Sequence, residues 1–343
     1  MHEAIPPTHP LPDFEVRLDP PDINDWLPGN TGILGVTSLD SGAPGPHVAI
    51  SALMHGNEYS GAIVLDRLLR AGVRPTRGRL SLAFLNVEAF SRFDPRRPTV
   101  SRFIDEDMNR LWDDQVLDGP RRSVELDRAR ELRPWLESVD VLLDLHSMLW
   151  PSDPVILCGP ADKGRDLALG LGGPSLIVAD RGHGNGRRLI DHPHFTEAGT
   201  PNVANLIEAG EHWDPVTVDV AMESVARVLA QVDSVAPGLD LPKGPTNPGR
   251  FARVTDVITA TTSHFAFVQP FRGCAVLPER NTLIAIDGEA EIRTPYDDCL
   301  LVLPSLRPGR GHTAVRLARF DESHRLSMRG VRFDVVGDML TPR

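Results

Sequence analysis

The residues with the clearest chemical potential are a histidine and a glutamate three positions apart, His55 and Glu58. They follow an apolar run, residues 48–54, that is typical of a buried strand, so they fall where a strand turns into a helix. A second histidine, His146, ends another apolar run, residues 139–146. Two histidines and one glutamate are the protein ligands of many catalytic zinc sites. The pattern therefore predicts a metal site built from these three residues.

Carboxylates near the ends of these strands could assist such a site. Asp144 lies two residues before His146, hence on the same face of the strand, where it could hydrogen-bond a ligand imidazole; the alternative is a helix or loop cap. Glu208 ends a further apolar strand and could act as general base towards a metal-activated water. Glu211 competes for this role, and both glutamates could simply be solvated.

Residues 101–112 combine two arginines with an amide, namely Arg102, Asn109 and Arg110. Arginine matches a carboxylate with two parallel hydrogen bonds and can also neutralise an oxyanion. This segment could therefore bind an anionic substrate. The alternative is charge that faces solvent and pairs with the neighbouring aspartates.

Strands and helices alternate in the first two thirds of the chain. Strand 48–54, helix 58–71 and strand 79–86 form a βαβ unit, which requires a mostly parallel sheet. Further elements are predicted at residues 121–137, 215–232 and near 161–171 (helices) and at residues 139–146, 154–158, 175–179 and 202–208 (strands). We expect an α/β fold with a mostly parallel mixed sheet flanked by helices. The loops 87–120 and 181–200 could close over a pocket at the carboxyl ends of the strands.

The pattern changes after a stretch rich in proline and glycine near residue 240. We place a domain boundary there: residues 1–240 form the catalytic domain, and residues 246–343 form a small all-β domain with a C-terminal tail. Short β-like runs separated by turns support this second domain, at residues 263–268, 282–286, 300–303 and 313–317.

The composition excludes several classes of protein. A chain of 343 residues with 41% hydrophobic and 24% charged residues can bury a sizeable core. Its formal net charge of -11 disfavours nucleic acids and anionic membranes as partners. Three scattered cysteines fit a reducing compartment, and the N-terminal residues lack the pattern of a signal peptide. We expect a cytoplasmic protein with a small-molecule substrate; a homo-oligomer is compatible with the sequence.

Taken together, these motifs resemble the succinylglutamate desuccinylase/aspartoacylase family, which is related to the zinc carboxypeptidases. The resemblance rests on four blocks in the family's order: His-Gly-Asn-Glu at 55–58, Ser-Arg-Phe-Ile-Asp-Glu-Asp-Met-Asn-Arg at 101–110, Asp-Leu-His-Ser at 144–147 and Ile-Glu-Ala-Gly at 207–210. The β-rich segment at the C-terminus is also similar to that of the family. The resemblance implies a zinc-carboxypeptidase-like fold for the first domain.

Carried over residue by residue, the resemblance implies one zinc ion (Zn2+) per chain, held by His55, Glu58 and His146. It further implies that Glu208 activates the attacking water and that Arg102 polarises the scissile carbonyl.

The resemblance also implies that Asn109 and Arg110 grip the α-carboxylate of the substrate. One position departs from the family: the arginine that binds a second carboxylate in aspartoacylases falls at Ala198 here. Three arginines of the preceding loop are candidates to replace it: Arg181, Arg187 and Arg188.

We therefore expect a zinc-dependent hydrolase that cleaves the amide bond of an N-acyl amino acid or a related small amide. One alternative is a zinc carboxypeptidase acting on small peptides. Another is a catalytically silent homologue that binds a metal or a metabolite.

Overall fold

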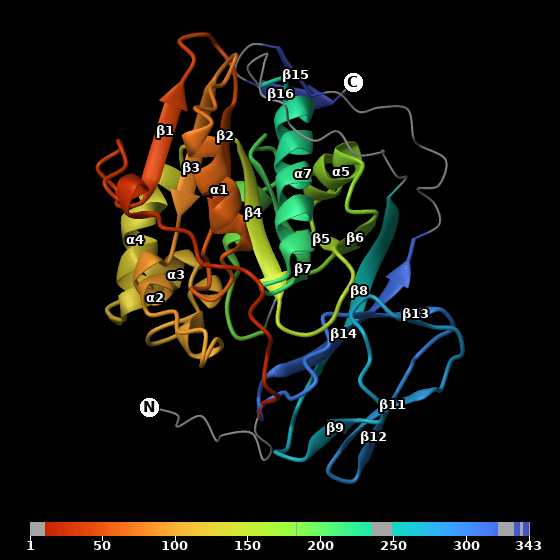
Figure 1. Ribbon diagram of the computed structural model, residues 1–343. Coiled ribbons are helices and arrows are strands. Elements are labelled where there is room, and N and C mark those ends of the chain that lie inside the picture. Colours follow the sequence, from red (N-terminus) through yellow and green to blue (C-terminus); the bar gives the residue numbers. More distant parts are fainter. Residues whose placement is uncertain (1–10, 183, 235–248, 322–332, 337–338, 343) are drawn as a thin grey trace.

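The computed structural model describes residues 11–182, 184–234, 249–321, 333–336 and 339–342. A large sheet of eleven strands crosses the molecule, with helices packed against it (Figure 1). The order of its strands is β1-β3-β2-β4-β7-β5-β6-β8-β14-β13-β10. A three-stranded sheet, β12-β11-β9, and a hairpin, β15-β16, complete the β structure of the described residues.

The strands of the first part of the chain are β1 Val36–Asp40, β2 His47–Ala52, β3 Arg79–Phe84, β4 Val141–Met148, β5 Val155–Cys158, β6 Leu176–Ala179 and β7 Val203–Glu211. Those of the second part are β8 Arg250–Thr259, β9 Phe265–Phe267, β10 Val276–Leu277, β11 Leu283–Asp287, β12 Ala290–Arg293, β13 Cys299–Val302, β14 Thr313–Phe320, β15 Phe333–Val336 and β16 Met339–Pro342. The α-helices are α1 Ser60–Arg70, α2 Val87–Ser91, α3 Asp114–Leu117, α4 Val124–Leu136, α5 Asp162–Leu171, α6 Pro193–Thr196 and α7 Pro215–Gln231. Short 3-10 turns are η1 Asn24–Trp26, η2 Val100–Arg102, η3 Met108–Arg110 and η4 Leu189–Asp191.

The centre of the large sheet is parallel. Strands β3, β2, β4 and β7 run side by side in one direction. Strand β1 closes one edge antiparallel to β3, and β5 pairs antiparallel to β7 on the other side. The predicted α/β class, with a mostly parallel mixed sheet, is confirmed.

Both faces of this sheet are buried, which explains why its strands are apolar throughout. On β2, the side chains of Ile50 and Ala49 point to opposite faces and join different apolar clusters. Helices α1, α5 and α7 cover the first face and lie in front of the sheet in Figure 1, whereas α4 packs into the cluster on the second face. Gly61 lets α1 approach closely, because a Cβ there would lie 2.9 Å from that of Ala52 and 2.8 Å from that of Leu145.

Four strands of the C-terminal β segment belong to the large sheet. Strand β8 pairs in parallel with β6, and β14, β13 and β10 then continue the large sheet antiparallel to it. Strands β9, β11 and β12 form a separate antiparallel sheet, and β15 and β16 form a hairpin of their own. The predicted boundary near residue 240 lies outside the described residues, so the division into two domains stays a prediction.

Two details refine the predicted elements. The helix expected over 121–137 begins at Val124, because the Ser123 side chain accepts a hydrogen bond from the Leu126 N–H and caps the first turn. The expected long loops 87–120 and 181–200 contain the short helices α2, α3 and α6 and three 3-10 turns. Within the described residues, none of the helices combines the length and the apolarity needed to cross a membrane.

Candidate metal centre and active-site cavity

The parallel strands bring the predicted site residues to one edge of the sheet. His55 follows the end of β2, His146 lies near the end of β4, and Glu208 lies near the end of β7. Neighbouring parallel strands place their carboxyl ends together. In register, His146 of β4 is the direct partner of Glu208 of β7.

A tight turn after β2 delivers His55 and Glu58. Leu53 adopts a left-handed backbone conformation (φ 62°) that is unfavourable for a branched side chain, and it is fully buried. Gly56 passes so close to the backbone of Ala89 and Phe90 that a Cβ there would lie 2.4 Å from both. The glycine of the His-Gly-Asn-Glu motif is therefore required by packing.

The three predicted ligands converge. Glu58 Oε1 lies 2.8 Å from His55 Nδ1, and Glu58 Oε2 lies 3.0 Å from His146 Nδ1. All three side chains are buried, and one candidate ligand atom from each lies within 4.8 Å of the others. Burial alone would raise the pKa of Glu58, but the adjacent imidazoles hold it well below its ordinary value.

The outer nitrogens of both histidines face aspartates. His146 Nε2 is 2.8 Å from Asp144 Oδ2, and Asp144 in turn accepts a hydrogen bond from the Ser51 hydroxyl. His55 Nε2 is 2.9 Å from Asp107 Oδ1. Carboxylates in this place orient the imidazoles of metal sites. The hydrogen-bonding alternative for Asp144 is therefore realised, and its role as a cap is not.

The donor set fits a divalent cation. His55 Nδ1 is buried and makes no well-oriented hydrogen bond within the described part of the chain, although Glu58 Oε1 is only 2.8 Å away. Two imidazoles and one carboxylate can thus each offer a ligand atom to one ion. Neutral imidazole and carboxylate are the ligand types that zinc accepts.

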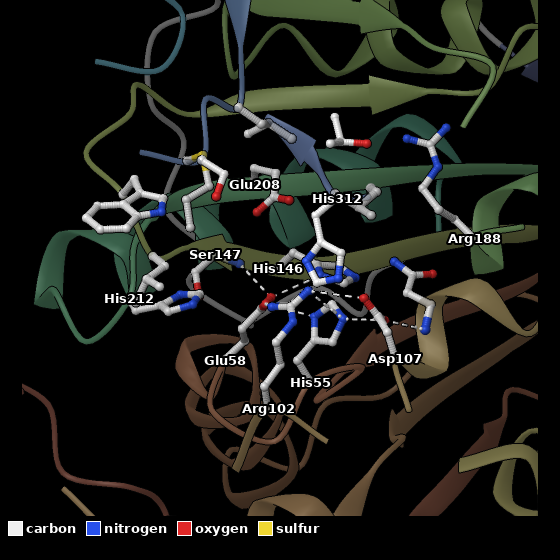
Figure 2. Close-up of a pocket in the computed structure, with 18 of the residues that line it drawn as sticks. His55, Glu58, Arg102, Asp107, His146, Ser147, Arg188, Glu208, His212 and His312 are labelled. Atoms are coloured by element: carbon white, nitrogen blue, oxygen red, sulfur yellow. Dashed lines mark hydrogen bonds and ion pairs between the residues drawn. The ribbon is translucent and has the colours of Figure 1, made fainter. Parts of the chain in front are cut away.

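The guanidinium of Arg102 lies beside Glu58, His55 and Asp107 and brings a positive charge to them. Its Nη1 donates to Glu58 Oε1 at 2.8 Å, and its Nη2 is 2.9 Å from His55 Nε2 and 3.5 Å from Asp107 Oδ2 (Figure 2). The guanidinium therefore stands at the boundary between the predicted metal ligands and the space beside them.

Glu208 faces the same space from the opposite side, above the three ligands in Figure 2. Its Oε2 is buried and has no hydrogen-bond partner among the described residues. Burial, and to a smaller extent the charge of Glu58, raise the pKa of Glu208 to about 8. Glu211, by contrast, lies 3.5 Å from Arg272 Nη1 and does not line the cavity described below. Of the two competing glutamates, the geometry favours Glu208.

A buried glutamate of α4, Glu125, fixes the segment that carries Arg102, Asn109 and Arg110. Its Oε1 accepts the backbone N–H of Ile104 at 2.6 Å, and its Oε2 accepts those of Asp105 and Glu106 at 3.0 and 3.3 Å. The exposure of Glu125 is 0%. A carboxylate with three backbone donors is well satisfied in the interior. The sequence analysis did not single out this residue.

Asn109 and Arg110 lie on η3 and both line the cavity. Asn109 Oδ1 accepts the Leu189 N–H at 2.8 Å, so the amide nitrogen is the end that can donate to a ligand. Arg110 Nη1 donates to the Asn109 carbonyl at 2.7 Å, and its Nη2 is 3.6 Å from Asp107 Oδ2. Burial lowers the pKa of Arg110 to about 10, which still leaves it charged at neutral pH.

A cavity of about 820 Å³ opens over these residues, which is large enough for a drug-sized ligand. It is lined by all seven predicted site residues: His55, Glu58, Arg102, Asn109, Arg110, His146 and Glu208. Its wall also contains residues that the sequence analysis missed or left among several candidates, among them Ser147, Arg188, His212, His312 and Arg316. His312 and Arg316 come from the C-terminal β segment, and Figure 2 shows His312 above the predicted ligands.

Ser147 and His212 form a buried pair beside the predicted metal centre. Ser147 Oγ is 2.7 Å from His212 Nδ1, and the Ser147 N–H donates to Glu58 Oε2 at 3.2 Å. Burial lowers the pKa of His212 to about 4, so its imidazole is neutral at pH 7. A neutral imidazole that accepts from Ser147 carries its proton on Nε2, as a donor. The position of His212, four residues beyond Glu208, was the only sequence signal for it.

The comparisons with known proteins agree with these motifs. Residues 44–153 match the family model of the succinylglutamate desuccinylase/aspartoacylase catalytic domain. A succinylglutamate desuccinylase of Pseudomonas aeruginosa is 32% identical over 132 residues, which is 36% of this chain and 37% of that protein. The predicted resemblance to this family is confirmed. The chain matches little more than a third of the length of that curated relative.

Solved structures of the family share the fold over nearly the whole chain. A succinylglutamate desuccinylase from Vibrio cholerae superposes with a TM-score of 0.65, covering 90% of this chain and 89% of that one at 15% identity. The ectoine utilization protein EutE (DoeB) from Ruegeria pomeroyi superposes with a TM-score of 0.57, covering 82% and 88% at 16% identity. At these identities the similarity establishes the fold.

The chain departs from the family at the second-carboxylate arginine. Ala198 is exposed and does not line the cavity. Of the three candidate replacements only Arg188 lines it, and its guanidinium is held by Asp191, with Nε at 2.6 Å from Oδ2, and by Asp180. Arg187 pairs with Asp113 instead.

A second group with ligand-like spacing consists of Asp114, Glu137 and His192, none of which lines the cavity. Arg133 already occupies it, with Nη2 at 2.8 Å from Asp114 and Nε at 2.9 Å from Glu137. A guanidinium that neutralises both carboxylates leaves little attraction for a cation. This group carries no metal assignment.

Proposed function

We propose that this protein is a metal-dependent deacylase that hydrolyses the amide bond of an N-acyl amino acid or a related small amide. The observation that carries the proposal is that His55, Glu58 and His146 bring one candidate ligand atom each to within 4.8 Å of the others, with Glu208 in the next strand as the register partner of His146. The names of the relatives, succinylglutamate desuccinylase and aspartoacylase, support the same class of reaction.

The three converging residues would hold one zinc ion. When bound, zinc polarises a carbonyl oxygen and makes water more acidic. This chemistry suits the cleavage of a stable amide. The buried donor set, oriented by Asp107 and Asp144, supports zinc over ions that prefer an all-oxygen shell.

Glu208 would move the proton in this reaction. Its carboxylate, with one oxygen free of partners among the described residues, takes a proton from the attacking water and returns it to the leaving nitrogen. Burial raises the pKa of Glu208 to about 8, and the charge of a bound cation would lower it again, leaving a carboxylate that can accept a proton and later return it. Arg102 is positioned to stabilise the negative charge that develops on the amide oxygen.

Asn109 and Arg110 would bind the α-carboxylate of the amino-acid part. Asn109 and Arg110 both line the cavity, and Arg110 lies close enough to Arg188 for the two charges to interact. Residues 303–305 and His312 of the C-terminal β segment also line the cavity. A wall on this side favours small amides over peptides, hence deacylation over carboxypeptidase activity.

The test combines metal content with hydrolysis. Purified protein is analysed for bound metals and assayed for release of free amine from N-acetyl, N-succinyl, N-formyl and N-benzoyl amino acids. We expect one zinc per chain, chelator-sensitive turnover of some of these amides, and loss of both in His146→Ala. A control, His264→Ala, alters an exposed histidine outside the cavity and should retain both. Absence of bound metal from the wild-type protein, or turnover that survives its removal, would contradict the proposal.

A further inference from the structure

The cavity has two chemically different ends. In Figure 2, Arg188 lies on one side of Glu208, and His212 with Ser147 lies on the other. We call the first side the arginine end; Arg110 and Arg316 line the cavity too, and both lie near enough to Arg188 for their charges to interact. We call the second side the apolar end; it is lined by residues 148–151, and the His212 backbone N–H donates to the Met148 carbonyl at 2.8 Å.

The arginine end has capacity for one carboxylate. Arg188 is bound by Asp191 through Nε and Nη2 and reaches Asp180 through Nη1. Arg316 Nε lies 2.8 Å from the same Asp180 carboxylate. These two aspartates balance two of the three guanidinium charges. The third guanidinium, that of Arg110, lies 3.6 Å from Asp107, but Asp107 also faces His55 and Arg102, so Arg110 keeps positive charge for a ligand. Under the proposed function, the α-carboxylate of the amino acid uses it.

The apolar end consists of Met148, Leu149, Trp150 and Pro151, which follow His146 along the chain. Trp150 packs edge-on against Phe14, with ring centroids 5.5 Å apart, and Phe14 contacts Trp213 in the same way at 6.1 Å. These contacts hold the indole in place, so the wall is preformed. A rigid aromatic wall provides contact area for an apolar group at low entropic cost.

Among the residues that the structure describes, the wall formed by residues 148–151 offers no cation of its own to a second carboxylate. His212, the titratable group that faces it, is neutral because it is buried. The nearby Arg272 does not line the cavity, since its Nε donates to Asp153 at 3.0 Å and its Nη1 lies 3.5 Å from Glu211. Met148 is buried, Leu149 and Trp150 are half-buried, and Pro151 is exposed. A carboxylate that packs against these apolar side chains loses part of its hydration and finds no charged partner among them.

We propose that the apolar end binds an uncharged, apolar acyl group, so that the substrate is an N-acyl amino acid whose acyl part lacks the second carboxylate of a succinyl group. This inference rests on the proposed function, because that function sets the orientation: the amino-acid carboxylate at Arg110, the amide at Glu208, and the acyl group beside Trp150. A volume of about 820 Å³ accommodates acyl groups larger than acetyl.

Binding tests the inference without relying on turnover. The zinc-loaded Glu208→Gln protein is titrated by calorimetry with the N-benzoyl, N-butyryl, N-acetyl and N-succinyl derivatives of alanine, leucine and glutamate. We expect the N-benzoyl or N-butyryl derivative to bind about tenfold more tightly than the N-succinyl derivative of the same amino acid. Equal or tighter binding of the N-succinyl derivatives, or no binding of any derivative, would overturn the inference.

Two variants at the apolar end sharpen this test. Trp150→Ala should weaken binding of the N-benzoyl derivative more than that of the N-acetyl derivative. Pro151→Arg places a cation on an exposed position of the wall and should shift the preference towards the N-succinyl derivative by about threefold to tenfold, relative to Pro151→Gln. An unchanged preference in both variants would show that residues 148–151 do not contact the acyl group, against the inference.

The proposed deacylase function and the proposed apolar acyl site can be disproved independently. If wild-type protein hydrolyses no amide of the panel while the Glu208→Gln protein still prefers the N-benzoyl derivatives, the proposed deacylase function is wrong and the apolar acyl site stands. If wild-type protein hydrolyses the N-succinyl derivatives with the highest kcat/KM, the deacylase function stands and the apolar acyl site is wrong.

Discussion

Glu208 and His146 are register partners on the neighbouring parallel strands β7 and β4. The side chains of the two residues project from adjacent, hydrogen-bonded backbone positions, so their relative position is set by the sheet itself rather than by a loop. A catalytic group must be held within about 0.5 Å of its productive position to transfer a proton, and a strand of the sheet provides this rigid support.

This relationship makes Glu208→Gln a sharp test of the general base. Glutamine preserves the shape of the side chain but cannot accept a proton, so we expect kcat to fall by about 10²-fold or more while the metal content stays unchanged. Steady-state hydrolysis and metal analysis of the purified variant check both statements. Glu211→Gln, three residues on and outside the cavity, is the matched control and should retain activity. Comparable rates for the wild-type and Glu208→Gln proteins would exclude Glu208 as the base.

The site residues that could be predicted from the sequence are those whose positions follow from local sequence patterns. His55, Glu58, His146 and Glu208 were predictable, because each follows an apolar strand and the ends of parallel strands meet. The α/β fold was also predictable, because the local sequence pattern shows the alternation of strands and helices.

The rest of the site depends on contacts between segments far apart in the chain. Glu125 looks like an ordinary residue of the first turn of α4, and only the folded chain shows that it caps the backbone of residues 104–106. His312 and Arg316 reach the cavity because β14 continues the large sheet, a pairing that no local pattern indicates. For the same reason, the expectation of a self-contained C-terminal β unit did not foresee that β8 joins β6.

Glu125 should control substrate binding from a distance. In Glu125→Gln one oxygen of the carboxylate becomes an NH2 group that faces the backbone donors of Asp105 and Glu106 or Ile104, so part of the network is lost. We expect a destabilisation of about 2 kcal/mol and a rise in KM that exceeds the fall in kcat, because the segment carrying Asn109 and Arg110 loosens. Urea unfolding and steady-state kinetics measure the two effects. Glu289→Gln, an exposed position outside the cavity, serves as the control. A loss of stability with unchanged KM would limit Glu125 to a structural role.

Gly56 should be intolerant of a side chain. In Gly56→Ala the new methyl group would lie 2.4 Å from the backbone of Ala89 and Phe90, which cannot move aside as a flexible side chain could. We expect a destabilisation of about 1–3 kcal/mol and reduced metal content, because His55 and Glu58 flank the displaced residue. Gly159→Ala is the matched control, since a Cβ there would meet its nearest neighbour at 3.7 Å. Equal stability and metal content in the two variants would refute the packing argument.

His212 should make the folded protein sensitive to acid. Burial lowers its folded-state pKa to about 4 from an ordinary value of 6.5, so between these values the unfolded chain binds a proton that the folded chain does not. The contribution of His212 to stability is therefore complete above about pH 6.5 and is lost as the pH falls towards 4. Between pH 7 and pH 5 the linkage amounts to about 2 kcal/mol.

The variant His212→Asn isolates this contribution. Asparagine Oδ1 can replace Nδ1 as the acceptor for the Ser147 hydroxyl but does not titrate in this range. The pKa values of His47 and His192 are also lowered by burial and contribute to the total slope, but they are unchanged between the two proteins. We therefore expect the free energy of unfolding, measured with urea at pH 7 and pH 5, to fall by about 2 kcal/mol less in His212→Asn than in the wild-type protein. An equal fall in both proteins would mean that His212 is protonated in the folded state at pH 5. This result would contradict the neutral imidazole assigned to it beside Ser147.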